Sequence, residues 1–188
     1  MLTKLILPAA LVAILGGCVS QGTYNQEVQQ ADTLAAQNKT YQALTAQLQS
    51  EIKADQVRIK QLQGQLTVTL IDEILFASGS AEMHASGRAT LEKIVGTLQS
   101  VSDKRINVRG YTDNEPIGPA LRARSPCIWE LSTARSSDIV RFLQAKGIDP
   151  KRLEASGYAE YQPVAPNTTP AGRKENRRIE IVLTDMKF

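Results

Sequence analysis

The 188-residue chain has little of what metal, redox or nucleic-acid chemistry requires. It contains one histidine, His84, and two cysteines, Cys18 and Cys127, too few for a zinc cluster and with no Cys-His pair at an informative spacing. Aromatic residues make up 5% of the chain and the net charge is +3, which argues against a nucleic-acid partner. No carboxylate cluster supplies an acid/base pair. We therefore expect no enzyme, no cofactor and no metal site.

Long apolar runs are also missing, except at the start of the chain. Lys4 precedes an apolar run over Leu5–Leu15, which is shorter than the roughly 18 residues that a membrane-spanning helix needs. Leu15-Gly16-Gly17-Cys18 resembles a bacterial lipobox. The resemblance implies a signal peptide over 1–17, cleavage before Cys18, lipid on that cysteine and a short lipidated linker over 18–23. Val19 is not aspartate, which by the usual bacterial sorting pattern implies an outer-membrane lipoprotein facing the periplasm.

Cys127 is then the one cysteine left unmodified, in an oxidising compartment. It either fills a position that suits a small, serine-like residue or forms an intermolecular disulfide. The first interpretation is favoured.

Proline is absent from 24–66 and glycine is absent there until Gly64, while glutamine and alanine are abundant. This composition predicts a long helix over 24–66. A three-four seam of apolar residues runs along it, at Tyr24, Ala31, Leu34, Tyr41, Leu48, Ile52, Ile59, Leu62 and Leu66. The seam is densest after Tyr41 and predicts a coiled coil with another copy or another protein. A solvated spacer of roughly 60 Å is an equally good interpretation.

From 67 to 188, strand-like and helix-like segments alternate. Expected strands lie at 67–71, 74–76, 106–110, 152–157 and 179–183, and amphipathic helices at 83–101 and 131–143. This order predicts an α/β domain of the α+β two-layer type, with helices on one face of a mixed sheet.

Candidate binding chemistry lies between Ile106 and Arg135. Asp113 follows an expected strand, and Arg135 lies in the helix after a loop rich in turn residues. A carboxylate and a guanidinium a few ångströms apart match a zwitterion, the first taking an ammonium and the second the neighbouring carboxylate. Two plainer interpretations stay open: Asp113 caps its own loop, and Arg135 pairs with Asp138 three residues on.

Five sequence blocks resemble the OmpA-like peptidoglycan-binding domain, in the same order and at similar spacing. They are Gly110-Tyr111-Thr112-Asp113, Leu131-Ser132-Thr133-Ala134-Arg135, Gly157-Tyr158, Pro163-Val164-Ala165 and 172–181. The resemblance implies that Asp113 and Arg135 hold the amino and carboxylate groups of meso-diaminopimelate in the stem peptide. Thr112, Leu131 and Ser132 belong to the same blocks, and a supporting role is implied for Asn176 and Arg177.

The loop segments 113–117 and 126–132 are most similar to the flagellar-stator (MotB-like) branch of that family. Ile128 departs from the pattern, because this branch usually has asparagine there. We therefore expect an outer-membrane lipoprotein that binds peptidoglycan non-covalently and tethers the membrane, or a complex attached through 24–66, to the wall. The alternative is a periplasmic scaffold component of an envelope-spanning secretion or motility machine, with weak or lost wall binding.

Overall fold

The computed structural model of the chain describes residues 20–62, 64–77, 80–118, 122 and 125–186. The predicted signal peptide over 1–17 and the predicted lipidation site Cys18 lie outside the described residues. The chain divides into two compact units, 1–33 and 34–188, and each is described by itself. Within the described ranges, no helix is long and apolar enough to span a membrane.

The second unit holds a five-stranded sheet with the strand order β1-β2-β5-β3-β4. Strands β3 and β4 pair in parallel, whereas the other neighbours pair antiparallel, so the sheet is mixed as predicted. The elements are α1 (Gln21–Gln47), α2 (Gln49–Lys53), β1 (Val57–Leu62), β2 (Gln65–Ile71), α3 (Ala85–Ser100), β3 (Lys104–Tyr111), α5 (Ile128–Ala145), β4 (Leu153–Gly157), α6 (Pro170–Asn176) and β5 (Arg178–Asp185). Short 3-10 turns lie at η1 (Asp72–Ile74) and η2 (Pro150–Arg152).

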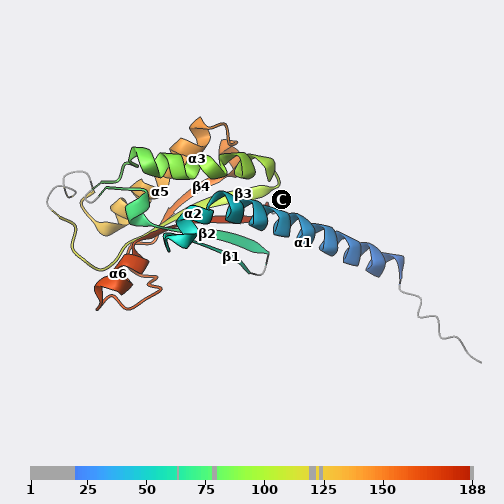
Figure 1. Cartoon of the computed structure of the whole chain (residues 1–188), viewed down its shortest axis with the longest axis horizontal. Coiled ribbons are helices and arrows are strands. Elements are labelled where there is room, and N and C mark those ends of the chain that lie inside the picture. The colour runs from blue at the N-terminus through green and yellow to red at the C-terminus, as the bar shows by residue number, and fades with distance from the viewer. Residues whose placement is uncertain (1–19, 63, 78–79, 119–121, 123–124, 187–188) are drawn as a thin grey trace, which may run out of the picture. The chain divides into compact units, whose positions relative to one another are not determined.

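Helices α3 and α5 lie on the same side of the sheet, which confirms the two-layer prediction (Figure 1). The core between the layers is apolar. It contains the predicted inner face of α3 and alternate residues of the central strands, namely Leu91, Ile94, Val95, Leu98, Val68, Leu70, Ile106, Val108, Ile179 and Ile181. This burial of apolar surface on one face of each element is the main source of the domain's stability.

The predicted helix over 24–66 is wrong in its second part. Helical structure ends at Lys53, and residues 57–62 form β1, an edge strand paired with β2. Asp55 ends the helix with φ of 56°, a left-handed conformation that aspartate tolerates better than most residues. Gly64, with φ of 76°, lies in the turn between β1 and β2.

The coiled-coil prediction fails for the half of the seam after Tyr41. Leu44 and Leu48 are fully buried in the core of the chain's own domain, and Tyr41 and Ile52 pack against that core. Thr97 on α3 donates a hydrogen bond to Gln47 at 2.9 Å. The partner that the seam requires is therefore the sheet and α3. Before Thr33, the helix is exposed over every described residue, for roughly 20 Å along its own axis.

The segment 74–76 is not a strand. The carbonyl of Asp72 accepts hydrogen bonds from Leu75 N and Phe76 N at 2.9 Å, which closes the turn η1, and only a single bridge joins Phe76 to Met83. The turn places two acidic residues, Asp72 and Glu73, directly after β2.

Two glycines bring the N-terminal end of α5 onto the sheet. A Cβ atom at Gly110 would clash with the carbonyl of Ser132, and one at Gly157 would clash with the side chain of Thr133. Only glycine allows this close approach at the ends of β3 and β4. The first two turns of α5 therefore lie beside the loop that follows β3, where the predicted binding residues are found.

Candidate functional site

A pocket of about 430 Å³ opens where the ends of β2 and β3 meet the start of α5. Its lining combines acidic and basic side chains with apolar ones. The lining residues are Asp72, Glu73, Phe76, Thr112, Asp113, Glu115, Pro116, Ile117, Gly118, Ile128, Leu131, Arg135 and Arg177. They come from four segments of the chain, 72–76, 112–118, 128–135 and 177, which the fold brings together.

Asp113 stands just after β3, with its side chain 9% exposed. Its Oδ1 accepts a hydrogen bond from Glu115 N at 3.1 Å, so the loop-capping interpretation applies to one of the two carboxylate oxygens. Its Oδ2 accepts a hydrogen bond from Arg177 Nη1 at 2.6 Å. Asp113 is thus both a turn residue and one member of an ion pair.

Arg135 lies in α5 and is buried, with its side chain 7% exposed. Its Nη1 forms an ion pair with Asp72 Oδ2 at 2.9 Å, and its Nε donates a hydrogen bond to the carbonyl of Ser80 at 3.0 Å. The guanidinium lies over the ring of Phe76, 5.2 Å from its centre. The interpretation that pairs Arg135 with Asp138 is wrong, because Asp138 accepts from Met83 N and pairs with Arg141.

Asp72 is the most perturbed carboxylate of the pocket. Burial raises the pKa of Asp72 to about 6, although the nearby charges of Arg135 and Arg177 oppose the increase. Burial likewise lowers the pKa of Arg135, against the pull of Asp72. The two charges therefore lie together in a poorly solvated place, where each is stabilised by the opposite charge in place of water.

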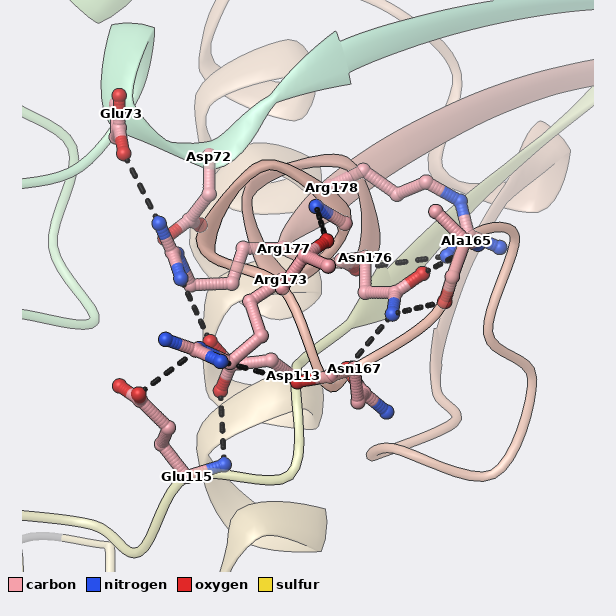
Figure 2. A network of polar contacts seen from close by, with 12 residues as sticks. Asp72, Glu73, Asp113, Glu115, Ala165, Asn167, Arg173, Asn176, Arg177 and Arg178 are labelled. Atoms are coloured by element: carbon pink, nitrogen blue, oxygen red, sulfur yellow. Dashed lines mark hydrogen bonds and ion pairs between the residues drawn. The ribbon is translucent and has the colours of Figure 1, made fainter.

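Arg177, which follows α6, connects two acids of the pocket. It pairs with Asp113 at 2.6 Å and with Glu73 at 3.1 Å (Figure 2). Burial disfavours its charge, but the hydrogen bonds to both acids outweigh this effect and raise the pKa of Arg177. Lys174 pairs with Glu73 at 3.3 Å and Arg173 pairs with Glu115 at 2.9 Å. Arg173 and Lys174 belong to α6 and Arg177 directly follows it, so this helix brings three basic side chains to the acids of the pocket.

Asn176 fixes the loop before α6. It is fully buried, its Oδ1 accepts from Val164 N and Ala165 N, and its Nδ2 donates to Ala165 O and Asn167 Oδ1 (Figure 2). Arg177 is the next residue, so this network sets where its guanidinium can reach. The supporting role expected for Asn176 and Arg177 has this geometric form.

The structure brings five of the six predicted site residues to the pocket: Thr112, Asp113, Leu131, Arg135 and Arg177. Ser132 is not among the lining residues and is fully buried. Its hydroxyl accepts a hydrogen bond from Ala159 N at 3.2 Å and donates to Trp129 O at 3.0 Å. Ser132 therefore braces α5 against the loop after β4. Ile128 does line the pocket, so the departure from asparagine changes its wall directly.

Sequence reasoning missed Asp72 and Glu73. The available signal was a pair of acids that interrupts an apolar run over 70–76, directly after an expected strand. A charged residue inside such a run is costly to bury unless it has a partner. Its presence there points to a paired or functional carboxylate.

The remaining cysteine has a structural position that agrees with the favoured interpretation. Cys127 is the N-cap residue of α5, where serine is common, and its backbone N–H donates to Glu130 Oε2 at 3.1 Å. It is exposed and free. Among the residues that the structure describes, no group of three or more His, Cys, Asp or Glu side chains could hold a metal ion.

Fold and pocket together define a small α/β binding domain that presents paired charges in a half-open cavity. The model of the OmpA family matches residues 75–177, more than half of the sequence, and the chain belongs to that family. Motility protein B of Bacillus subtilis is 30% identical over 154 residues, which are 79% of this chain and 58% of that protein. The chain spans about half the length of the curated relatives it matches.

Two solved structures are similar over most of the chain. A MotB-like protein from Desulfovibrio vulgaris matches with a TM-score of 0.75 and 29% identity, covering 84% of this chain and 99% of that one. The cell wall anchor of the T6SS from Pseudomonas aeruginosa matches with a TM-score of 0.69 and 34% identity, covering 76% and 97%. The predicted resemblance to the OmpA-like domain, near its MotB-like branch, is confirmed.

Proposed function

We propose that the chain binds peptidoglycan non-covalently, by holding the zwitterionic end of diaminopimelate in the stem peptide. The observation that carries this proposal is the pocket itself, which is lined by both predicted residues, Asp113 and Arg135, and in which Arg135 forms a buried ion pair with Asp72. A free amino-acid end carries an ammonium and a carboxylate on one carbon. Arg135 offers donors in a planar fork to the carboxylate, and the acidic residues attract the ammonium.

The pocket suits recognition and offers little for bond cleavage. A hydrolase needs a general acid and base, or an activated water, at the scissile bond. Here Asp72, Asp113 and Glu73 each form an ion pair with an arginine, so each carboxylate already has a fixed partner. The similarity to a cell wall anchor supports the same proposal.

We further propose that the protein is an outer-membrane lipoprotein facing the periplasm. The lipobox-like residues Leu15 to Cys18, with Val19 after them, support this proposal. More than one acyl chain on Cys18 would anchor the protein stably, whereas one chain alone gives marginal binding. Cys18→Ser should abolish incorporation of labelled palmitate and release the protein from membranes. Unchanged labelling of this variant would contradict the proposal.

The competing proposal is a periplasmic scaffold of an envelope machine whose wall binding is weak. Two observations favour it: Ile128 replaces an amide in the pocket wall, and the exposed start of α1 presents Tyr24 and Val28 to solvent. Both proposals hold together if the domain binds the wall while the start of α1 recruits a complex.

The decisive measurement is cosedimentation of the full-length chain, in mild detergent, with diaminopimelate-type sacculi. Asp113→Ala and Arg135→Ala should each remain in solution while the wild type pellets, since truncating a buried charged contact costs roughly 2 to 5 kcal/mol. Arg141→Ala is the matched control, because Arg141 lies on the same helix with a 66% exposed side chain. Wild-type protein that stays in solution would exclude wall anchoring and leave the scaffold proposal.

A further inference from the structure

Two aromatic side chains stack on each other at the surface beside the start of α5. Trp129 lies in the first turn of this helix and Tyr161 in the loop that follows β4, and their ring centres are 5.4 Å apart with 26° between the ring planes. Trp129 is 47% exposed and Tyr161 is 63% exposed. A single exposed aromatic residue needs no explanation, but two that stack and stay about half exposed form a continuous flat apolar surface.

The backbone around this pair is fixed by hydrogen bonds that also reach the pocket. The hydroxyl of Ser132 donates to Trp129 O at 3.0 Å and accepts from Ala159 N at 3.2 Å. The carbonyl of Ala159 accepts from Thr112 N at 2.9 Å, and Thr112 lines the pocket. Ala159 has a φ of 51°, a left-handed conformation that costs free energy for a residue with a Cβ atom. The loop that carries Tyr161 is therefore held in place, which lowers the entropy cost of binding to it.

The polar atoms of the pair lie at the edges of its rings. Within the described residues, neither the indole N–H of Trp129 nor the hydroxyl of Tyr161 forms a hydrogen bond, so both can bond to a ligand. A pyranose ring has C–H groups on one face and hydroxyl groups around its rim. The C–H groups are slightly positive and pack on the negative face of an aromatic ring, while the rim can reach the donors beside it. The pair therefore suits both the apolar and the polar parts of a sugar ring.

The size of this surface favours a small ring over a protein. A stable protein interface buries roughly 800 Å² on each partner, which is about 20 to 30 residues. Over the described residues 80–118, 122 and 125–186, three large apolar side chains are exposed, namely Trp129, Tyr161 and Val164. An apolar surface of this size is sufficient for one ring of a chain-like ligand.

The place of the pair beside the pocket indicates which sugar it would meet. Ile128, Leu131 and Arg135 line the pocket from one side of α5, and Trp129 lies roughly 100° around the helix from Ile128. A helix with its side chains is roughly 10 to 12 Å wide, and three residues of extended peptide span roughly 10 Å. The stem peptide of peptidoglycan joins diaminopimelate to a sugar of the glycan strand over a distance of this order. A stem peptide bound in the pocket can therefore place its own sugar on the pair.

We propose that Trp129 and Tyr161 bind a sugar ring of the glycan strand whose stem peptide occupies the pocket. This inference rests on the proposed function, because the pocket must hold that peptide. It adds a second contact, made by carbohydrate, outside the residues that line the pocket. Two contacts with one ligand would also fix the direction in which the glycan strand crosses the domain.

Two soluble ligands separate the sugar contact from the peptide contact. One is the free stem peptide that contains diaminopimelate, and the other is the same peptide with its disaccharide, released from sacculi by a muramidase. Calorimetric titration of the full-length protein in mild detergent should show about three- to ten-fold tighter binding of the second ligand, as expected for one stacked ring. Tyr161→Leu and Trp129→Leu should lose this difference between the two ligands.

Three further measurements show whether the aromatic rings make the contact. Tyr161→Phe keeps the ring and loses the hydroxyl, so it should keep most of the difference. Tyr24→Leu removes a tyrosine of α1 that is 58% exposed and should keep all of it. Trp129 is the one tryptophan, so acrylamide quenching of its emission reports the contact directly. The disaccharide ligand should protect Trp129 from acrylamide more than the free peptide does.

Three results would contradict the inference in different ways. If wild type binds both ligands equally, with the same acrylamide quenching, the sugar does not contact the pair, and the inference is wrong while the proposed function stands. If both leucine variants keep the full difference, the sugar binds elsewhere and a protein partner is left as the ligand of the pair. If wild type binds neither ligand, the proposed function itself fails.

Discussion

Removing one member of the buried pair of Asp72 and Arg135 should lower the domain's free energy of unfolding more than removing both. Each side chain is 7% exposed, so losing one partner leaves the other charge poorly solvated. Arg135→Met and Asp72→Asn should each destabilise the fold by about 3 to 5 kcal/mol. The double variant removes both charges of the pair. Its free energy of unfolding should be close to that of wild type, or higher.

The pKa of Asp72 also predicts how the destabilisation by Arg135→Met should change with pH. The pKa of Asp72 is raised from 3.8 to about 6, a shift that corresponds to about 3 kcal/mol. An acid whose pKa is higher in the folded state makes the fold less stable as the pH rises from its unfolded pKa through its folded pKa. Removing Arg135 takes away the charge that opposes this shift. The destabilisation by Arg135→Met should therefore be smaller at pH 5 than at pH 8.

Urea unfolding followed by fluorescence is the assay. Trp129, the one tryptophan, lies in the first turn of α5 and stacks on Tyr161, so its emission reports the region of the site. Two results would refute the view that burial couples these charges. One is that the losses of unfolding free energy in the two single variants add up in the double variant, and the other is that Arg135→Met loses the same amount at pH 5 and at pH 8.

Three further changes test other parts of the structure. Ile128→Asn restores an amide to the pocket wall and should strengthen sacculus binding several-fold in the cosedimentation assay; weaker binding would contradict this role. Ser132→Ala leaves Ala159 N–H without its acceptor and should lower the free energy of unfolding by about 1 to 3 kcal/mol. Leu48→Ala should cost about 2 to 5 kcal/mol in the same urea assay, whereas Leu34→Ala, at an exposed position, should change it little; equal effects would restore the coiled-coil interpretation.

The sequence correctly predicted the elements in which the spacing of apolar residues fits a helix or a strand but not both. The inner face of α3, with Leu91, Ile94 and Leu98, follows a helical spacing that no strand shares, and it is buried as expected. Strand β3 ends at Tyr111, two residues before the predicted aspartate Asp113. The alternation of such elements was enough to predict the mixed two-layer fold.

The boundary between helix and strand over 54–66 could not be placed from spacing. Ile52, Ile59 and Leu66 are seven residues apart and therefore fit a heptad, yet Val57 and Ile59 also alternate with polar residues as in a strand. The choice depends on β2, which offers β1 an edge to pair with. A tertiary contact of this kind leaves no pattern in the neighbouring residues. Asp55 alone is a weak signal for the end of the helix.

The site was predicted in part, for a related reason. Resemblance and chemistry together indicated Asp113 and Arg135, and the pocket contains both. Neither could show that Asp72 pairs with Arg135, because that contact joins segments more than sixty positions apart. Ser132 lies in the same block as Arg135, but its face of α5 meets the sheet, so sharing a motif did not mean sharing the pocket.

The acids that line the pocket are balanced one for one by bases. The pairs are Asp72 with Arg135, Asp113 with Arg177, Glu73 with Lys174 and Glu115 with Arg173. Such a surface projects little net field beyond the Debye length of roughly 8 Å at physiological ionic strength. It would neither draw a ligand in from a distance nor repel one, and binding of a neutral zwitterion would change little as the salt concentration of the surroundings rises and falls.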